Sequence, residues 1–278
     1  KEESARNVSI VQSAVAFGTI AGPSVGSILA GWVGYRGSMT VSFIVVSLAV
    51  LLVYCLVDER RKVTGCARQT SLWQDFRVAF KMPVLLTAMF SDMAAGLVTM
   101  ASQPILILHI QKLTGKAADL FCGPIFSLPG LAILLTNYTW CRIGEKRTFQ
   151  KVVLVGLTGM GLFTVMQGMT SNIWIFALFY FAGGIFAAAV SPNTAGLVTT
   201  NVDPDFQGRA FSIQQSSRNL GNLVAPLLSG IIGSFLPFQW VFIVVGCLSL
   251  MAMVLIRFQM RTWAAPVSAP ETKEAIAG

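Results

Sequence analysis

Two charged residues stand inside long apolar stretches of this sequence, where they could support proton chemistry. Asp92 lies in the run MFSDMAAGL and Arg218 in FSIQQSSRNLGN. A charge in the middle of a membrane helix costs about 2.5–3.5 kcal/mol on insertion scales, so such residues are candidates for function. Asp92 and Arg218 lie at similar depths from one side, so we predict that they pair and that Asp92 is proton-sensitive. The alternatives are a fixed structural ion pair and a carboxylate near the headgroup boundary.

The helix that carries Arg218 also carries a polar face, which could bind a substrate. Its members recur at helical spacing on one side: Ser212, Gln215, Arg218, Asn219 and Asn222. Amide groups that face lipid are costly, so this face should line a water-filled cavity on the substrate path or contact another helix. Weaker candidates for the same cavity are Gln103, on the helix of Asp92, and Ser191 and Asn193, on the stretch 173–199.

The composition indicates what must position these residues. Hydrophobic residues make up 54% of the 278 residues and charged residues only 12%, whereas a soluble domain carries about 25% charge. With one His and five scattered Cys, a metal or haem site is not expected, and no cofactor is predicted. The net charge of +8 comes from basic residues in short segments between apolar runs, which favours a membrane protein over a nucleic-acid-binding one.

Eight apolar stretches are long enough to cross a bilayer, which takes about 20 residues. They are predicted at 9–33, 38–57, 84–110, 118–138, 151–169, 173–199, 209–234 and 238–258. Sixteen of the 20 Lys and Arg residues then lie on the side of the N-terminus, and three lie on the other side. Because positive charge accumulates in cytoplasmic loops, both ends of the chain are predicted to be cytoplasmic.

One segment occurs twice in the chain. Residues 6–28 read RNVSIVQSAVAFGTIAGPSVGSI, and residues 209–231 read RAFSIQQSSRNLGNLVAPLLSGI, at a constant offset of 203 residues. Both copies enter the membrane from the same side in the predicted topology, so the repeat is parallel. Small residues recur every four positions, which lets neighbouring helices approach closely. In the second copy these residues are Gly221, Ala225, Ser229 and Gly233.

Short motifs in these segments resemble those of a known family. GTIAGPSVGS (residues 18–27) resembles the Gly-x-x-x-Gly-Pro-x-x-Gly signature on the fifth helix of drug:proton antiporters of the major facilitator superfamily. GRAFSIQQSSRNLGN (residues 208–222) resembles the start of the eleventh helix in bacterial multidrug exporters of that branch. The matching residues of the antiporter signature are Gly18, Gly22, Pro23 and Gly26.

A third motif resembles a loop of the same family. CRIGEKR (residues 141–147) is similar to the Asp-Arg-x-Gly-x-Lys/Arg loop between helices eight and nine, which the resemblance implies to be a gating loop. Cys141 stands where the family has an acidic residue. The matching residues are Arg142, Gly144, Lys146 and Arg147.

The resemblance implies an all-α membrane protein with a major facilitator fold, whose two halves are parallel repeats. The chain would hold helices 5–12 of 12, as an N-terminally truncated form. Its expected parts are the last two helices of the N-terminal half, a cytoplasmic central loop, a six-helix C-terminal half and a disordered cytoplasmic tail. These parts are predicted at 1–57, 58–83, 84–258 and 259–278.

The implied function is that of a secondary transporter in the inner membrane, which exports small amphipathic organic compounds in exchange for protons. An uptake carrier for a sugar or another metabolite, and a non-functional truncated remnant, are the alternatives. A membrane enzyme is disfavoured because the apolar stretches hold one His and no paired carboxylates. The sequence has no phosphate-binding loop of the Gly-x-x-x-x-Gly-Lys-Ser/Thr type. The expected partners are therefore lipid, a small organic substrate and protons, without ATP or nucleic acid, and the expected state is a monomer.

Overall fold

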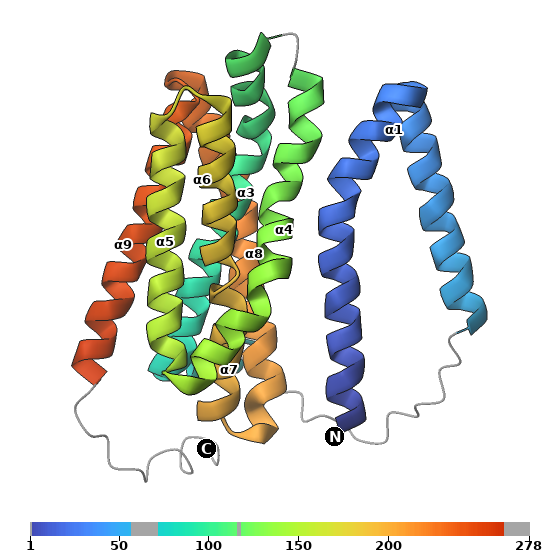
Figure 1. Cartoon of the computed structure of the whole chain (residues 1–278). Helices are drawn as coiled ribbons and strands as arrows, with labels where there is room; N and C mark the ends of the chain where they lie inside the picture. The colour runs from blue at the N-terminus through green and yellow to red at the C-terminus, as the bar shows by residue number, and fades with distance from the viewer. Residues whose placement is uncertain (1, 57–71, 116–117, 264–278) are drawn as a thin grey trace.

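A computed structural model describes residues 2–56, 72–115 and 118–263 of the chain, and these form helices and no strand (Figure 1). Long helices run roughly parallel to one another and are joined by short connections. Helices suit a bilayer because each one satisfies its own backbone hydrogen bonds. The predicted all-α architecture is confirmed.

The first helix, α1 (Glu2–Leu56), is a hairpin of two helical arms that lies beside the rest of the structure (Figure 1). The arms correspond to the first two predicted spans. The chain reverses at Gly34, whose φ of 74° lies in the left-handed region that favours glycine. Among the helices that the structure describes, α1 packs against α4, and the large apolar side chains of its second arm, such as Phe43 and Tyr54, are exposed.

Seven further helices form a bundle. α3 lies along α8, α5 along α9 and α4 along α6. Large side chains such as Leu106, Leu157, Phe176 and Phe242 are fully buried between them. The seven helices are α3 (Pro83–Thr114), α4 (Ala118–Lys146), α5 (Phe149–Met169), α6 (Ile173–Ala187), α7 (Val190–Asn201), α8 (Pro204–Phe235) and α9 (Gln239–Trp263).

Six of the eight predicted spans are confirmed by helices that are long and apolar enough to cross a membrane. The span predicted at 209–234 does not qualify, although α8 is 32 residues long, because its polar face lowers its mean hydropathy. The span predicted at 9–33 is helical, but most of its side chains lie outside the described residues. The qualifying segments are Arg36–Cys55, Pro83–Leu113, Phe121–Lys146, Phe149–Met169, Ile173–Asn201 and Gln239–Gln259.

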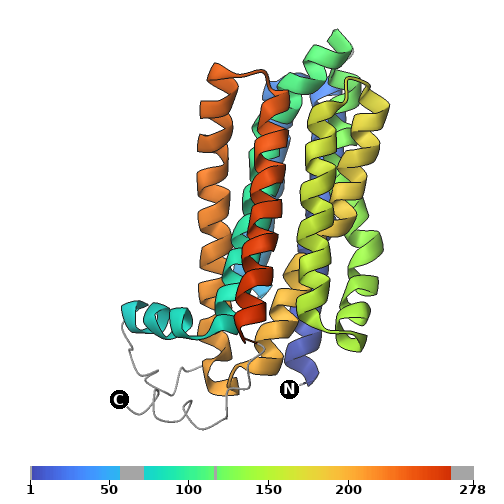
Figure 2. The ribbon, with the colours of Figure 1, turned by 90° about the vertical axis from the view of Figure 1, so that its left-hand side faces the viewer.

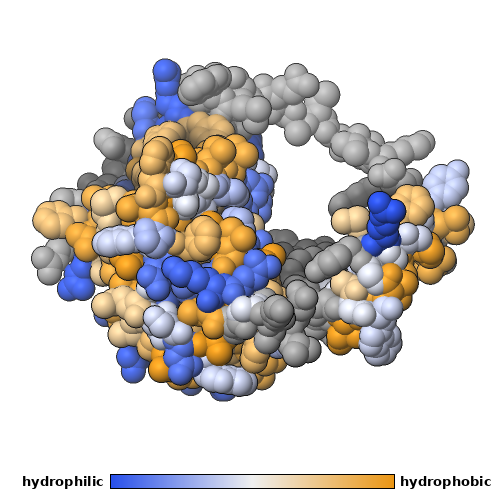
Figure 3. Space-filling view, turned by 90° about the horizontal axis from the view of Figure 1, so that it is seen from above, coloured by the Kyte–Doolittle hydropathy of each residue, from blue (hydrophilic) through white to orange (hydrophobic). Residues whose placement is uncertain are grey.

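The outer surface suits a lipid environment. Seen from above, apolar side chains lie around the rim of the bundle and on the part of α1 that is coloured (Figure 3). Many of them are large and exposed, among them Leu135 on α4, Leu178 on α6 and Phe258 on α9. An apolar surface of this extent would drive aggregation in water, and it is expected of a protein embedded in a bilayer.

The sequence predicts a loop over the whole central segment, 58–83, but part of this segment is helical. Residues 72–81 form a 10-residue helix, α2 (Leu72–Lys81), which runs across the end of the bundle where α1 begins (Figure 2). Its Ala79 is buried in a small apolar cluster with Leu85 of α3 and Ala210 of α8. This contact explains why so short a segment is helical. Residues 58–71 lie outside the described part of the chain.

Two helices extend beyond their predicted ends. α4 continues through Lys146, so most of the predicted gating loop at 141–147 is the last part of a helix. Trp140 anchors this part, because its indole Nε1 donates a hydrogen bond to the carbonyl of Ile185 at 2.8 Å. α9 continues to Trp263, so the predicted disordered tail at 259–278 begins with helix, and its residues 264–278 lie outside the described part.

Small residues allow α3 and α8 to lie close together. Gly221 of α8 faces the backbone carbonyl of Met93, and Gly96 of α3 faces the backbone carbonyl of Arg218 on α8. Ser229 donates a hydrogen bond to the carbonyl of Ala101 across the same interface at 2.7 Å. The ribbon of small residues predicted for this helix is confirmed as its packing surface.

Candidate functional site

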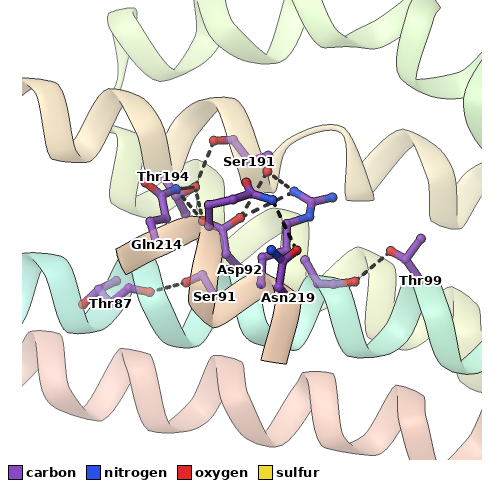
Figure 4. A network of polar contacts seen from close by, with 11 residues as sticks. Thr87, Ser91, Asp92, Thr99, Ser191, Thr194, Gln214 and Asn219 are labelled. Carbon is purple, nitrogen blue, oxygen red and sulfur yellow. Dashed lines mark hydrogen bonds and ion pairs between the residues drawn. The ribbon is translucent and has the colours of Figure 1, made fainter. Parts of the chain in front are cut away.

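The Asp92 side chain lies where α3, α7 and α8 meet, and it is only 1% exposed (Figure 4). Ser191 Oγ donates a hydrogen bond to its Oδ1 at 3.1 Å. Thr194 Oγ1 donates to its Oδ2 at 2.8 Å, and Gln214 Nε2 donates to the same oxygen at 2.5 Å. Three side chains from two other helices therefore converge on one buried carboxylate.

Arg218 completes this cluster from α8. Its Nη1 lies 3.7 Å from Asp92 Oδ1, and its side chain is 32% exposed. The same Nη1 also donates a hydrogen bond to Ser191 Oγ, so Ser191 bridges the two charged groups. The predicted pairing of Asp92 and Arg218 is present in the structure. One partner is buried and the other reaches the edge of the bundle, so the pair connects the interior with the more open side of α8.

The hydrogen bonds around Asp92 have a common direction. Ser191, Thr194 and Gln214 each present a hydroxyl or amide donor to the carboxylate, and Arg218 presents a guanidinium group. An ionised carboxylate only accepts hydrogen bonds, whereas a protonated carboxyl group also donates one. These donors therefore stabilise the charged form of Asp92 and oppose its burial, which favours the neutral form.

A break between two helices positions the residues of α7. α6 ends at Ala187 and α7 begins at Val190, with a turn at residues 188–189. Pro192 lies in the first turn of α7, where its missing N–H group leaves no helical hydrogen bond unmade. Ser191 and Thr194 are three residues apart on α7, so they point to the same side, toward Asp92.

Two residues of this cluster were not among the sequence candidates. Gln214 is 7% exposed and Thr194 is fully buried. Helical spacing could have found them, since Gln214 precedes Arg218 by four residues and Thr194 follows Ser191 by three. The missing information was which of two adjacent polar residues faces the neighbouring helix.

The other sequence candidates do not contact Asp92. Gln103, Gln215 and Asn219 are exposed, and Gln215 Nε2 lies 3.4 Å from Asn219 Oδ1 on the open side of α8. Asn222 is half-buried and its Oδ1 lies against Gly96. The polar face predicted on this helix is thus mostly exposed, and the packed side of α8 carries Gln214 instead.

Asn193 is buried but faces away from Asp92. Its Nδ2 donates hydrogen bonds to the carbonyls of Ala189 at 2.7 Å and Trp140 at 3.4 Å. Its Oδ1 has no hydrogen-bond partner in the part of the chain that the structure describes, and it lies directly against Gly144. Asn193 therefore belongs to the contact between α7 and α4, and its predicted role in a substrate cavity stays a prediction.

The predicted gating residues fall into two groups, one exposed and one buried. Arg142, Lys146 and Arg147 are exposed, whereas Gly144 is buried against Asn193. The basic residues can meet water or headgroups. Gly144 has a packing role, because it admits the Asn193 side chain.

We expect Gly144→Ala to destabilise the protein by about 1–3 kcal/mol, the usual range for overpacking. The added Cβ would meet Asn193 Oδ1, and it would also lie 2.9 Å from Cδ1 of Phe149. Thermal unfolding in detergent measures the loss. Combining Gly144→Ala with Asn193→Ala should cost less than the sum of the two single changes; strict additivity would contradict the contact.

The antiporter-signature residues lie apart from this site, on the first arm of α1. Among the described residues, a Cβ placed on Gly18, Gly22 or Gly26 would meet nothing within 4 Å. The side chain of Pro23 lies outside the described residues. The structure therefore does not join the signature helix to the Asp92 cluster, and the role of these residues stays a prediction.

The fold and the site together define a multi-pass membrane protein with a hydrogen-bonded ion pair between its helices. A sequence profile described as Major Facilitator Superfamily matches residues 1–118 and, in a second match, residues 84–277. These matches span nearly all of the chain. The chain belongs to the Major Facilitator Superfamily, a family of membrane transporters.

Several curated proteins are similar to the chain. It is 28% identical over 228 residues to the multidrug resistance protein MdtG of Proteus mirabilis (strain HI4320), covering 81% of this chain and 56% of that protein. It is 26% identical over 251 residues to the uncharacterized MFS-type transporter YuxJ of Bacillus subtilis (strain 168), covering 89% and 64%. MdtG of Salmonella paratyphi C (strain RKS4594) is 27% identical over 230 residues, covering 82% and 57%. The chain thus spans less than two thirds of the length of these relatives.

Proposed function

We propose that the protein is a secondary transporter that exports small amphipathic organic compounds in exchange for protons. The observation that carries the proposal is the buried Asp92, held by donors from α7 and α8 inside a membrane bundle. Ionisable residues within membrane segments are rare and are typical of ion pathways and proton relays. The similarity to two proteins named MdtG, a multidrug resistance protein, supports export as the direction of transport.

In this proposal Asp92 is the proton-binding group and Arg218 is its counter-ion. The ionised carboxylate is stabilised by Ser191, Thr194 and Gln214, and it pairs with Arg218. When Asp92 takes a proton, its attraction to Arg218 is lost. The two protonation states therefore favour different arrangements of the helices, as alternating access requires.

The substrate would bind on the open side of α8. Gln215 and Asn219 present amides there, and exposed apolar residues such as Leu220 and Leu223 lie on the same helix. A largely apolar surface with a few polar groups suits amphipathic compounds and permits loose specificity. Because Arg218 reaches this side, the substrate and the proton site would be adjacent.

The proposed arrangement in the membrane has both ends of the chain in the cytoplasm, as the distribution of basic residues predicts. The exposed Arg142, Lys146 and Arg147 at the end of α4 would then lie at the cytoplasmic surface. α1 would supply the last two helices of the N-terminal half, and α3 to α9 would form the C-terminal half. The two halves would rock against each other during transport.

A susceptibility panel in cells tests the proposed function. Deletion of the gene should make cells more susceptible to several amphipathic toxic compounds, and overexpression should make them more resistant. A growth defect on a single carbon source, with unchanged susceptibility, would contradict export and would instead indicate an uptake carrier.

A further inference from the structure

Gln214 stands out among the residues around Asp92 because it joins three helices at once. From α8, its Nε2 donates hydrogen bonds to Asp92 Oδ2 on α3 at 2.5 Å and to Thr194 Oγ1 on α7 at 2.8 Å (Figure 4). Both amide hydrogens are thereby used. The amide lies between a carboxylate and a hydroxyl that themselves share a hydrogen bond.

The other end of the same amide has no partner. Gln214 Oε1 is buried, and no hydrogen-bond donor reaches it within the described part of the chain. A buried oxygen without a donor is unfavourable, and most such atoms in native proteins are paired. The Gln214 amide is therefore oriented for a charged Asp92 at the expense of its own oxygen.

We infer that Gln214 is a positioning residue that holds Asp92 in its ionised form and transmits the protonation of Asp92 to α7. The inference deepens the proposed proton-coupled transport and rests on it. Among the described residues, Arg218 is the charged group that acts on Asp92. α7 contributes only the hydroxyls of Ser191 and Thr194 to the carboxylate.

Protonation changes what the carboxyl group needs. When a proton from water binds at Oδ2, this oxygen carries an O–H bond and requires an acceptor. The uncommitted oxygen of Gln214 becomes that acceptor if the amide turns over. The new Oδ2–H to Oε1 hydrogen bond replaces the bond from Nε2 to Oδ2. The bond from Nε2 to Thr194 is lost as well, and the Thr194 hydroxyl, which can donate or accept, now faces Oε1 and can donate to it. The hydrogen bond that links Gln214 of α8 to Thr194 of α7 therefore reverses its direction when Asp92 becomes neutral.

The test is a titration of Asp92 by infrared difference spectroscopy on the full-length protein in lipid vesicles. The carboxyl band that disappears in Asp92→Asn identifies the group. Gln214→Met keeps the approximate shape of the side chain but removes the hydrogen bond to the ionised carboxylate, and a bond of this kind favours the charged form. We expect the proton affinity of Asp92 to increase about tenfold in this variant, since one pH unit corresponds to about 1.4 kcal/mol.

The matched control is Gln167→Met on α5. Gln167 is also a buried glutamine whose Oε1 has no partner among the described residues, and it lies outside the set of side chains that donate to Asp92. We expect it to leave the titration of Asp92 unchanged. Gln214→Asn is the second variant, to be used if Gln214→Met fails to fold. It retains an amide but places it one methylene group farther from Asp92, and we expect the same increase in the proton affinity of Asp92.

The outcomes separate this inference from the proposed function. An unchanged titration midpoint in the Gln214 variants, or an equal shift in Gln167→Met, would overturn the role of Gln214 even if the protein exports drugs. The expected shift in a protein that moves no drug would leave the role of Gln214 in place and would refute the transport proposal. The absence of any titrating band from Asp92 would overturn both.

Discussion

Asp92→Asn is expected to reduce proton-driven efflux by about tenfold or more, to the level of vesicles without protein, because the substituted amide cannot bind and release a proton. Asparagine preserves the shape of the side chain, and its one amide oxygen can still accept a hydrogen bond from Ser191, so the fold should persist. Uptake of a fluorescent amphipathic dye into inverted membrane vesicles with an imposed pH gradient measures the loss.

The matched control is Asp203→Asn. Asp203 is an exposed carboxylate just before α8, and asparagine serves equally well at the start of a helix. Efflux by this variant should equal that of the unmodified protein. Full efflux by Asp92→Asn would remove Asp92 from the mechanism, and a parallel loss in Asp203→Asn would show that the effect is not specific to the buried site.

Gly221→Val is expected to produce the largest loss of stability. A side chain at Gly221 would be driven into the backbone carbonyl of Met93, where neither helix can yield locally. Overpacking of this kind costs about 1–3 kcal/mol or more. For a protein of this size, a loss of about 3 kcal/mol lowers the unfolding temperature by roughly 6–12 °C. Thermal unfolding of the purified protein in detergent provides the measurement.

Gly230→Val on the same helix is the control for this substitution. A Cβ at Gly230 would meet nothing within 4 Å, so the change should alter stability by no more than about 0.5 kcal/mol. Equal effects at both glycines would contradict the close approach of α3 and α8. The Asp92 cluster depends on this approach, because the two helices carry Asp92, Gln214 and Arg218.

The helices could be predicted from the sequence because the thickness of a bilayer sets the length of an apolar run. α8 shows the limit of that argument. Its polar residues lower its mean hydropathy, so hydropathy alone is weak evidence that α8 crosses the membrane. The repeat that relates it to residues 6–28 is the stronger evidence. α2 was missed because its 10 residues are too few for a span and lie in a basic segment. Its docking onto α3 and α8 is a tertiary effect that local sequence does not reveal.

The candidate site was predicted in part. The depths of Asp92 and Arg218 along their helices follow from counting residues, and counting was sufficient to predict their pairing. The rotation of each helix does not follow from counting. Adjacent residues differ by about 100° around a helix, and polar residues fill the stretches QQSSRN and SPNT. The sequence therefore could not decide between Gln214 and Gln215, or between Thr194 and Asn193.

The central claim is that the Asp92 cluster couples proton movement to export. The most direct test of this claim measures the proton movement that a substrate gradient drives. Full-length protein is reconstituted in vesicles that contain a pH-sensitive dye, and an amphipathic substrate identified by the susceptibility panel is added on one side without a pH gradient. The account predicts that protons move against the flow of substrate in the unmodified protein and that this movement is absent in Asp92→Asn. Substrate flux without proton movement in the unmodified protein, or undiminished proton movement in Asp92→Asn, would contradict it.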